Sequence, residues 1–413
     1  MSEVLNVSGL GVLRQPREVI FGPGQRRMIA PLVASLGTSV LLCTDERMVG
    51  TSECRDLIDQ LGLAGVAVHV FSQTLPDLPR SNIMRLAEEF RGRGIEAVIG
   101  LGGGSCLDMA KAASLMLSHP EDIREYYGEN QVPGATLPIV TVPTTAGTGA
   151  EISNFAVVFE EDKAMKVGVG SRHILPTIAV IDPELTLTCP PGLTAATAAD
   201  ALSHLIENAT DRSKNPSASD MMNHLYVGKN VLTDVYCREG LRLMAASMGR
   251  VASEPENIDV RTDLMFAAYC GGMALNTAGT AACHAIQAPI GNLTHTPHGF
   301  GVGALLPYVM RFNLPAHPTS FAEVARALGV FRAGASDEEN GGAAIEKVEE
   351  LLKAVGCPLT LEELGVSPDD FEAIASASLL ATRLTANNPR ELTHEAVMEI
   401  LRRAWHGDRS SWD

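Results

Sequence analysis

The sequence changes character at residues 189–194, CPPGLT, and this change limits the fold more than any other feature. Before it, short apolar runs alternate with amphipathic helical patterns. The runs are SVLLCTD (39–45), VAVHVF (66–71), AVIGLGGGS (97–105), LPIVTVPTT (137–145) and TIAVIDPEL (177–185), and the helical patterns cover 25–36, 52–62, 80–93 and 106–118. Strands that alternate with helices predict a parallel sheet with helices on both faces. FAVVF (155–159) and MKVGVG (165–170) add a predicted hairpin.

After the prolines, helical periodicity takes over. It covers 195–209, the stretches around 219–254, and 261–290, 318–329, 342–355, 367–383 and 392–405, whereas the polar ASDEENGG (335–342) predicts a surface loop. Pro190 and Pro191 disfavour a continuous helix and mark a junction. Because 413 residues exceed the usual size of a single core, we expect two domains. These are an α/β domain with a parallel sheet over residues 1–189 and an all-α domain over residues 190–413.

One long segment carries no charged side chain, because no Asp, Glu, Lys or Arg occurs from Leu264 to Met310. This stretch alone suggests a membrane span, but glycines and the polar side chains of Asn276, His284 and Gln287 interrupt it. We therefore expect a buried helix followed by a loop, and no membrane partner. The N-terminus also lacks the basic patch and apolar core of a signal peptide.

Charge and cysteine content narrow the partners and the compartment. The formal net charge is -17, which argues against a nucleic-acid partner or an anionic membrane surface. The eight cysteines form no CxxC pair and several lie in apolar runs. We expect free thiols rather than structural disulfides, and a cytoplasmic location.

Two glycine-containing loops follow predicted strands and offer a nucleotide site. In the first, GGGS after AVIGL, glycines let the backbone approach a phosphate, and Ser105 could cap the helix that follows. In the second, PTTAGTGAE (143–151), threonine hydroxyls accompany backbone amides. The glycine loop alone is better explained as a tight turn, and the second loop alone could be a polar turn, but the two together favour a nucleotide site. Asp45 ends the first clear strand. Its spacing alone favours a helix cap, whereas a role as ribose ligand would favour NAD over NADP.

Histidines and one aspartate suggest a metal site. Asp200 and His204 are four residues apart in a helical pattern and therefore share one face. Their apolar neighbours indicate burial, and a buried Asp needs a partner or a metal. His284 and His298 lie further along the chain and could each be an ordinary core or turn residue. Three imidazoles and one carboxylate together would suit Fe(II) or Zn(II).

The chain resembles the iron-containing (group III) alcohol dehydrogenases, whose fold is similar to that of dehydroquinate synthase. The resemblance spans nearly the full length. The matching segments, in order, are TDERM, GLGGGSCLDMAK, TVPTTAGTGAEIS, KVGVGSRHILPTIAVIDPELT, AATAADALSHLIE, ALNTAGTAACHAIQ and THTPHGFGVGALLP. It implies an N-terminal dinucleotide-binding domain and a helical metal-binding domain.

The resemblance also implies roles for individual residues. The implied metal ligands are Asp200, His204, His284 and His298. The implied cofactor residues are Gly102, Gly103 and Ser105 at the pyrophosphate, with Thr144, Thr145 and Thr148, then Asp45 at the ribose and Lys166 near the cofactor. The cofactors would be NAD and Fe(II), with Zn(II) as the alternative.

One position departs from the family pattern. Many members carry a further histidine four residues after the first loop ligand, where it is thought to relay protons, and this chain has Ala288 there. His295 could take the catalytic relay role from the neighbouring loop, or it could be an outward-facing loop residue. The sequence leaves both interpretations open.

The expected activity is hydride transfer between a small alcohol or aldehyde and NAD(H), with the metal polarising the alcohol oxygen. Substrate would lie between the domains, where Asn276 offers a polar contact. One alternative is an NAD- and metal-dependent lyase of the dehydroquinate synthase type, although the region around the metal residues is poor in the basic residues it needs. Another is an inactive relic. The resemblance further implies a homodimer or a larger homo-oligomer.

Overall fold

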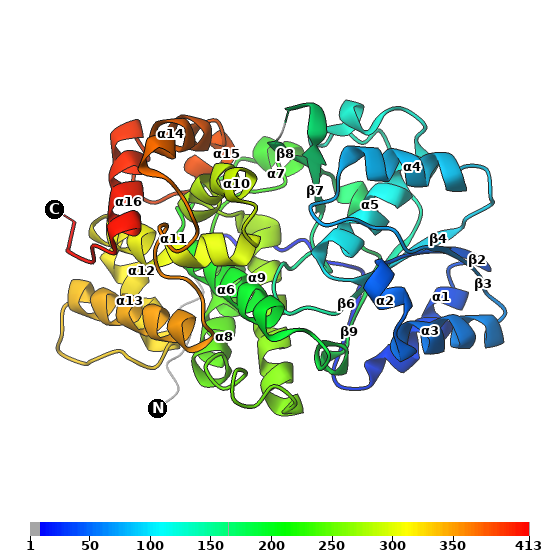
Figure 1. Ribbon diagram of the computed structural model, residues 1–413, viewed down its shortest axis with the longest axis horizontal. Coiled ribbons are helices and arrows are strands. Elements are labelled where there is room, and N and C mark those ends of the chain that lie inside the picture. Colours follow the sequence, from blue (N-terminus) through cyan, green and yellow to red (C-terminus); the bar gives the residue numbers. More distant parts are fainter. Residues whose placement is uncertain (1–8, 164, 413) are drawn as a thin grey trace.

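The computed structural model describes residues 9–163 and 165–412. Figure 1 shows a sheet-containing half, coloured blue through cyan to blue-green, beside a helical half that runs from green to red. All named strands of the described residues end by Ile181, and the first helix of the second half begins at Pro191. The fold class predicted from the sequence, an α/β domain with a parallel sheet followed by an all-α region, is therefore confirmed. The boundary at 189/190 stays a prediction.

The large sheet has six parallel strands in the order β1-β9-β6-β4-β2-β3. Their bounds are β1 (Glu18–Phe21), β2 (Ser39–Cys43), β3 (Ala67–Phe71), β4 (Ala97–Gly102), β6 (Ile139–Pro143) and β9 (Ile178–Ile181). From β2 the chain adds β3 on one side and β4 on the other, so the strand order reverses between β2 and β4. Ligands of open α/β sheets bind beyond the carboxyl ends of the strands at such a reversal.

Helices cover both faces of this sheet. They are α1 (Ile29–Ala34), α2 (Glu46–Val49), α3 (Ser52–Leu63), α4 (Arg80–Phe90) and α5 (Gly104–Ser118). Along β2, Leu41 and Cys43 pack with α4 and α5, whereas Val40 and Leu42 pack with α1 and α3. Because successive side chains of a strand point to opposite faces, one apolar strand fills both layers of core.

A second, smaller sheet lies beside α5. It contains β5 (Gly128–Glu129), β7 (Phe155–Glu160) and β8 (Met165–Gly170), in the order β5-β8-β7. The predicted hairpin is confirmed, since β7 and β8 pair antiparallel with Phe159 opposite Lys166. Lys111 of α5 is fully buried and ties the hairpin to the helix, because its Nζ donates to Ser153 Oγ at 2.8 Å and to the Phe155 carbonyl at 2.7 Å.

The second half consists of helices around one apolar core. They are α6 (Pro191–Thr210), α7 (Ala218–Asn223), α8 (Val231–Ser247), α9 (Ile258–Ala278), α10 (Ala282–Thr294), α11 (His298–Asn313), α12 (Pro318–Ala327), α13 (Asp337–Ala354), α14 (Phe371–Leu379), α15 (Thr382–Thr385) and α16 (His394–His406). In Figure 1, α6 lies at the centre of the molecule, at the boundary with the sheet-containing half.

The prediction for the uncharged run was wrong in one respect. Leu264 to Met310 is not a helix followed by a loop but the rest of α9, all of α10 and most of α11. Gly279 has φ +88° and ends α9, and its backbone leaves no room for a side chain beside Asn387. The Asn387 amide donates to the carbonyls of Ala278 and Thr280 at 3.2 and 3.0 Å, which satisfies the interrupted backbone.

Two local predictions also differ from the structure, and one strand was missed. Residues 335–342 are not a loop, because Ser336 and Glu339 form a reciprocal capping box that starts α13 at Asp337. The predicted helix 25–36 begins with a short 3-10 helix and ends at Ala34. Strand β1 was not predicted, since its four residues are too few to show a pattern.

Two composition-based expectations can be compared with the described residues. None of their helices combines the length and the apolar character that crossing a bilayer requires. All eight cysteines are buried and free.

Candidate dinucleotide site and metal centre

The end of β2 and the end of β4 meet at the reversal of strand order. Asp45 follows β2 and lies beside the glycine turn, because a Cβ at Gly102 would be 3.9 Å from its Oδ2. Its other oxygen, Oδ1, accepts the Met48 N–H at 2.7 Å and caps α2. Asp45 is thus a helix cap, as its spacing alone favours, and its Oδ2 faces the glycine turn.

The glycine turn is shaped by its contacts with α5. Gly102 has φ +146°, and a Cβ there would lie 2.6 Å from Cys106 Sγ, so only glycine fits. Gly103 is the N-cap residue of α5 and contributes no side-chain cap. The expectation that Ser105 caps this helix is wrong, because Ser105 lies inside its first turn. The first backbone N–H groups of α5 therefore remain available for a phosphate.

The two candidate loops are neighbours in space. A Cβ at Gly103 would lie 3.7 Å from Thr145 Oγ1, and one at Gly104 would lie 3.2 Å from Thr148 Oγ1. The Thr144 N–H donates to the Gly102 carbonyl at 2.9 Å. The Thr144 hydroxyl is buried and has no hydrogen-bond partner. The hydroxyls of Thr145 and Thr148 therefore lie beside the first N–H groups of α5, an arrangement that suits a phosphate group.

The second loop also joins the two halves of the molecule. A Cβ at Gly147 would be 2.6 Å from Thr197 Cβ of α6, and one at Gly149 would be 2.6 Å from Gly272 Cα of α9. These contacts leave no room for larger side chains. They bring this second loop, residues 143–151 and hereafter the threonine loop, to within one helical turn of Asp200.

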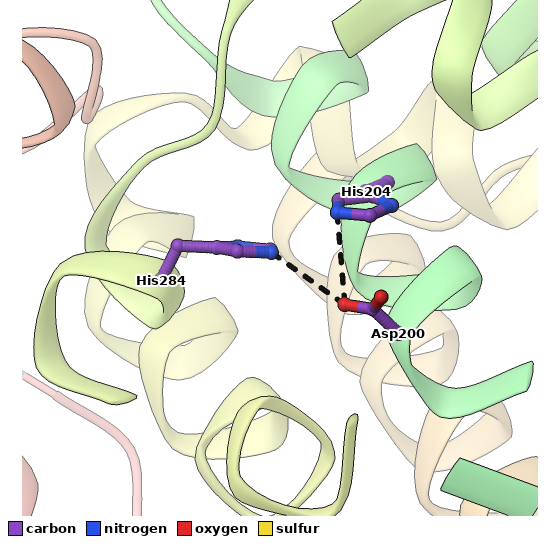
Figure 2. A group of neighbouring side chains, drawn as sticks. All are labelled: Asp200, His204 and His284. Atoms are coloured by element: carbon purple, nitrogen blue, oxygen red, sulfur yellow. Dashed lines mark ion pairs between the residues drawn. The ribbon is translucent and has the colours of Figure 1, made fainter. Parts of the chain in front are cut away.

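A cluster of metal-type ligands lies at this boundary. Asp200 and His204 come from α6 and His284 from α10, and Figure 2 shows both histidines directed at the Asp200 carboxylate. All three residues are buried, and their ligand atoms lie within 4.8 Å of one another. His298, the first residue of α11, directs its Nε2 to the same oxygen.

The distances in this cluster fit a shared ion better than hydrogen bonds. The Nε2 atoms of His204, His284 and His298 lie 3.6, 3.7 and 3.5 Å from Asp200 Oδ1. Two ligand atoms each about 2.1 Å from one ion, in tetrahedral arrangement, lie about 3.4 Å apart. Asp200 Oδ1 and His284 Nε2 are buried without a hydrogen-bond partner. Such unpaired atoms are costly unless something binds them. The residues present therefore fit a divalent metal.

Glu207 orients His284 and was not predicted. Its Oε2 lies 2.6 Å from His284 Nδ1, and its carboxylate accepts the N–H groups of Ala281 at 3.1 Å and Cys283 at 2.7 Å. Helix α10 has no capping side chain of its own, so Glu207 caps it from α6. A carboxylate behind a metal-binding histidine fixes the tautomer and raises the basicity of the ligand.

A glycine next to His298 fixes the position of that residue. Gly299 follows it, and a Cβ there would lie 1.8 Å from the Ala196 carbonyl oxygen of α6. The first turn of α11 therefore lies directly against the α6 backbone, one turn before Asp200. Helix α6 thus holds α11 by a close backbone contact and α10 through the Glu207 carboxylate.

Electrostatics within the cluster are strongly coupled. Burial would raise the pKa of Asp200, but His204, His298 and His284 outweigh it and lower the pKa below its ordinary value. Burial would lower the pKa of His284, but Glu207 and Asp200 raise it to about 10. Burial lowers the pKa of His298 to about 3, with His284 and Lys166 adding to the effect and Asp200 opposing it. A bound divalent cation would take the place of the protons that these shifted pKa values imply.

The remaining predicted residues lie in different surroundings. Lys166 of β8 forms an ion pair with Asp77. Its positive charge also lowers the pKa of His298. His295 is exposed at the C-cap of α10 with φ +54°, outside the Asp200 cluster. Ala288 is half-buried one turn after His284. The Asn276 amide is used within the fold. Its Oδ1 accepts the Asn154 N–H at 2.9 Å, and its Nδ2 donates to the Ile152 carbonyl at 3.0 Å. The expected contact with substrate is therefore unsupported.

One sequence pattern could have identified Glu207. Asp200, His204 and Glu207 are spaced i, i+4 and i+7, which places all three on one helix face. A buried Glu on the face of two potential ligands needs a partner of its own.

Comparisons with known proteins agree with this geometry. The family model "Iron-containing alcohol dehydrogenase" matches residues 16–183, and "Fe-containing alcohol dehydrogenase family, C-terminal" matches residues 194–405. The chain is 29% identical to NAD-dependent methanol dehydrogenase of Bacillus methanolicus, covering 94% of this chain and 98% of the relative. It is 32% identical to lactaldehyde reductase of Escherichia coli K12, covering 88% and 91%.

A solved structure shares the whole fold. Alcohol dehydrogenase from Oenococcus oeni superposes with a TM-score of 0.89 at 28% identity. The match covers 96% of this chain and all of that one.

Proposed function

The chain belongs to the iron-containing alcohol dehydrogenase family, and from this premise we propose how its residues divide the work of an NAD-dependent oxidoreductase. Asp200, His204, His284 and His298 would hold a divalent metal. The ends of β2, β4 and β6 would hold NAD(H). The observation that carries the proposal is the convergence of three imidazoles on Asp200 Oδ1 at 3.5 to 3.7 Å, beside the threonine loop.

The cofactor residues act by position and charge. Gly102 and Gly103 let the backbone approach the pyrophosphate, Ser105 lies in the helix turn that faces it, and Thr144, Thr145 and Thr148 add hydroxyls from the second loop. Asp45 Oδ2 would accept from a ribose hydroxyl and repel a 2′-phosphate, which favours NAD over NADP. Lys166 would meet the cofactor from β8, on the side of the metal residues.

The reacting groups would meet beside the Asp200 cluster, next to the threonine loop. When bound, the metal supplies Lewis acidity that polarises an alcohol or aldehyde oxygen, and the nicotinamide carries the hydride. Glu207 holds His284 in one tautomer, and the buried surroundings of the cluster limit access of water. His295 remains a proposal for proton transfer.

Iron is the proposed metal, with zinc as the alternative, since the donor set of three nitrogens and one oxygen suits both. The proposed substrate is a small alcohol or aldehyde, because the relatives above are named for methanol and lactaldehyde. The same names are all those of oxidoreductases, so nothing favours the lyase alternative.

Compartment and assembly are further parts of the proposal. Eight free, buried cysteines suit the reducing cytoplasm. A homodimer or larger homo-oligomer is expected from the family, and β1 leaves one edge of the sheet without a partner strand among the described residues.

The test is formation of NADH by metal-stripped protein that has been reloaded anaerobically with Fe(II) or Zn(II), across a panel of small alcohols. We expect no turnover without metal and turnover with at least one metal. Absence of turnover with every alcohol and metal, in protein that binds NAD, would favour the relic interpretation.

A further inference from the structure

The segment between β3 and α4 contains two adjacent residues in a disfavoured conformation. Asp77 has φ +59° and Leu78 has φ +52°, in the left-handed region that favours glycine. The Leu78 N–H donates to the Leu75 carbonyl at 3.3 Å, so residues 75–78 form a turn with Pro76 at its second position. Asp77 occupies the third position, where glycine or asparagine is usual. Such strain persists only where the surroundings impose it, and it concentrates at functional sites.

Contacts on both sides impose this conformation. The Leu78 side chain is buried in the core beneath α4 and α5, and its carbonyl accepts the Phe159 N–H at 3.0 Å. The Leu75 N–H donates to Asn82 Oδ1 of α4 at 3.0 Å. The turn is therefore fixed to β7 at one end and to α4 at the other.

The anchored turn directs Asp77 toward the hairpin. Phe159, which bonds the turn, lies opposite Lys166 in the β7–β8 pair. Asp77 Oδ1 lies 2.7 Å from Lys166 Nζ, although the Asp77 side chain is 61% exposed. Strand β8 contacts α10, the helix that carries His284. The ion pair thus connects the carboxyl end of β3 to the metal side of the cofactor site.

Stability does not explain this arrangement. An ion pair whose aspartate side chain is 61% exposed contributes little to folding, and glycine at residue 77 would remove the strain there. We propose that Asp77 is a positioning residue, which the strained turn presents to Lys166 so that the ammonium is held toward bound NAD(H). The inference rests on the proposed function, because Lys166 is assigned to the cofactor there.

The first test compares Asp77→Asn and Asp77→Gly with wild type, by titration of NADH fluorescence and by steady-state kinetics. Both variants should raise Kd for NADH and KM for NAD about fivefold, with kcat at saturating NAD nearly unchanged. Asp77→Gly should keep or raise Tm, because it relieves the strain. Asp77→Glu, which keeps the negative charge, should bind NADH more tightly than Asp77→Asn but less tightly than wild type. Asp59→Asn, at an exposed residue of α3, is the matched control for loss of one negative charge.

A double-mutant cycle shows whether Asp77 acts through Lys166. If it does, Asp77→Asn has no further effect on Kd when Lys166→Met is already present. Additive effects of the two substitutions would overturn the inference, as would an unchanged Kd in Asp77→Asn. If the wild-type chain itself binds no NADH, the proposed function fails and the inference falls with it. Normal NADH binding by wild type and by Asp77→Asn would overturn the inference alone.

Discussion

At the scale of single residues, the proposed metal ligands depend on a side chain that would not contact the metal. Glu207 links three groups of α10 to α6 through one carboxylate. Without it, the first turn of α10 would lack a cap and His284 Nδ1 would lose its hydrogen-bond partner. The precision of the cluster therefore depends on a residue one turn beyond its ligands.

Glu207→Gln should weaken metal binding while leaving the four ligands in place. We expect the Kd for Fe(II) or Zn(II), measured by competition with a chelator, to rise about 10- to 100-fold. Glu350→Gln, on the exposed face of α13, is the control for loss of a carboxylate. Equal metal affinity in the Glu207→Gln variant and wild type would show that His284 needs no orienting partner.

A second buried carboxylate makes stability depend on pH. Glu151 is the last residue of the threonine loop and is 5% exposed. Burial raises its pKa from 4.5 to about 7, with Lys111 opposing. The folded state therefore binds the proton more tightly than the unfolded state. Stability contributed by the protonated form is fully present below about pH 4.5 and is lost as pH rises through about 7.

Glu151→Gln should remove this loss. We expect the free energy of unfolding of the variant to exceed that of wild type by about 3 kcal/mol above pH 7, and the gain to vanish near pH 4.5. Urea denaturation at about pH 5 and about pH 8 measures both limits. The exposed Glu125→Gln is the control. A difference between Glu151→Gln and wild type that is independent of pH would contradict the assigned burial.

Sequence reasoning could identify the ligand types but not every neighbour of them. Asp200 and His204 share a helix face by spacing alone, so their proximity was predictable. Asp45 and the glycine turn are separated by more than fifty residues, and only the strand order β3-β2-β4 makes them adjacent. Spacing cannot supply that order, because it depends on how the whole sheet assembles.

At the scale of elements, glycines determine how closely the two halves approach. Gly149 and Gly272 face each other, and a Cβ at Gly272 would lie 2.8 Å from Gly149 Cα. The neighbouring Gly271 has more room, since its Cβ would lie 3.4 Å from His204 Cβ. Two adjacent positions of α9 thus differ in whether a methyl group fits.

Substitutions at Gly271 and Gly272 distinguish the effect of helix propensity on stability from the effect of close packing. Ala in place of Gly within a helix stabilises by about 1 kcal/mol when nothing clashes. We expect Gly271→Ala to be neutral or stabilising, and Gly272→Ala to lower the free energy of unfolding by about 1–3 kcal/mol and to reduce activity. Thermal and urea denaturation of both variants measure this. A Gly272→Ala variant as stable as Gly271→Ala would mean that the two halves are not held in this contact.

Element boundaries were predictable only where the cap is local. Ser336 and Glu339 lie three residues apart, and this capping box could have revealed the start of α13 within the supposed loop. The break between α9 and α10 depends on Gly279, Asn387 and Glu207, which are remote in sequence. Hydrophobic periodicity alone therefore read the two helices as one.

At the scale of the whole molecule, the proposed function depends on joining the sheet-containing half to the helical half. The threonine loop belongs to the first half and packs against α6 and α9 of the second. Because the same loop contacts the glycine turn, a cofactor held there would lie beside the Asp200 cluster. Hydride transfer from an alcohol would require both the nicotinamide cofactor and the metal, and the residues proposed to bind them lie in different halves.

The most direct test of this joining follows hydrogen itself. Metal-stripped protein is reloaded with Fe(II) or Zn(II) and given NAD and a primary alcohol deuterated at the carbon that bears the hydroxyl. We predict metal-dependent net formation of NADH that carries deuterium, one per alcohol oxidised, and none in the metal-stripped protein or in Asp200→Asn. NADH formation at the same rate without metal, or no deuterium in the NADH formed, would contradict metal-assisted hydride transfer at this site.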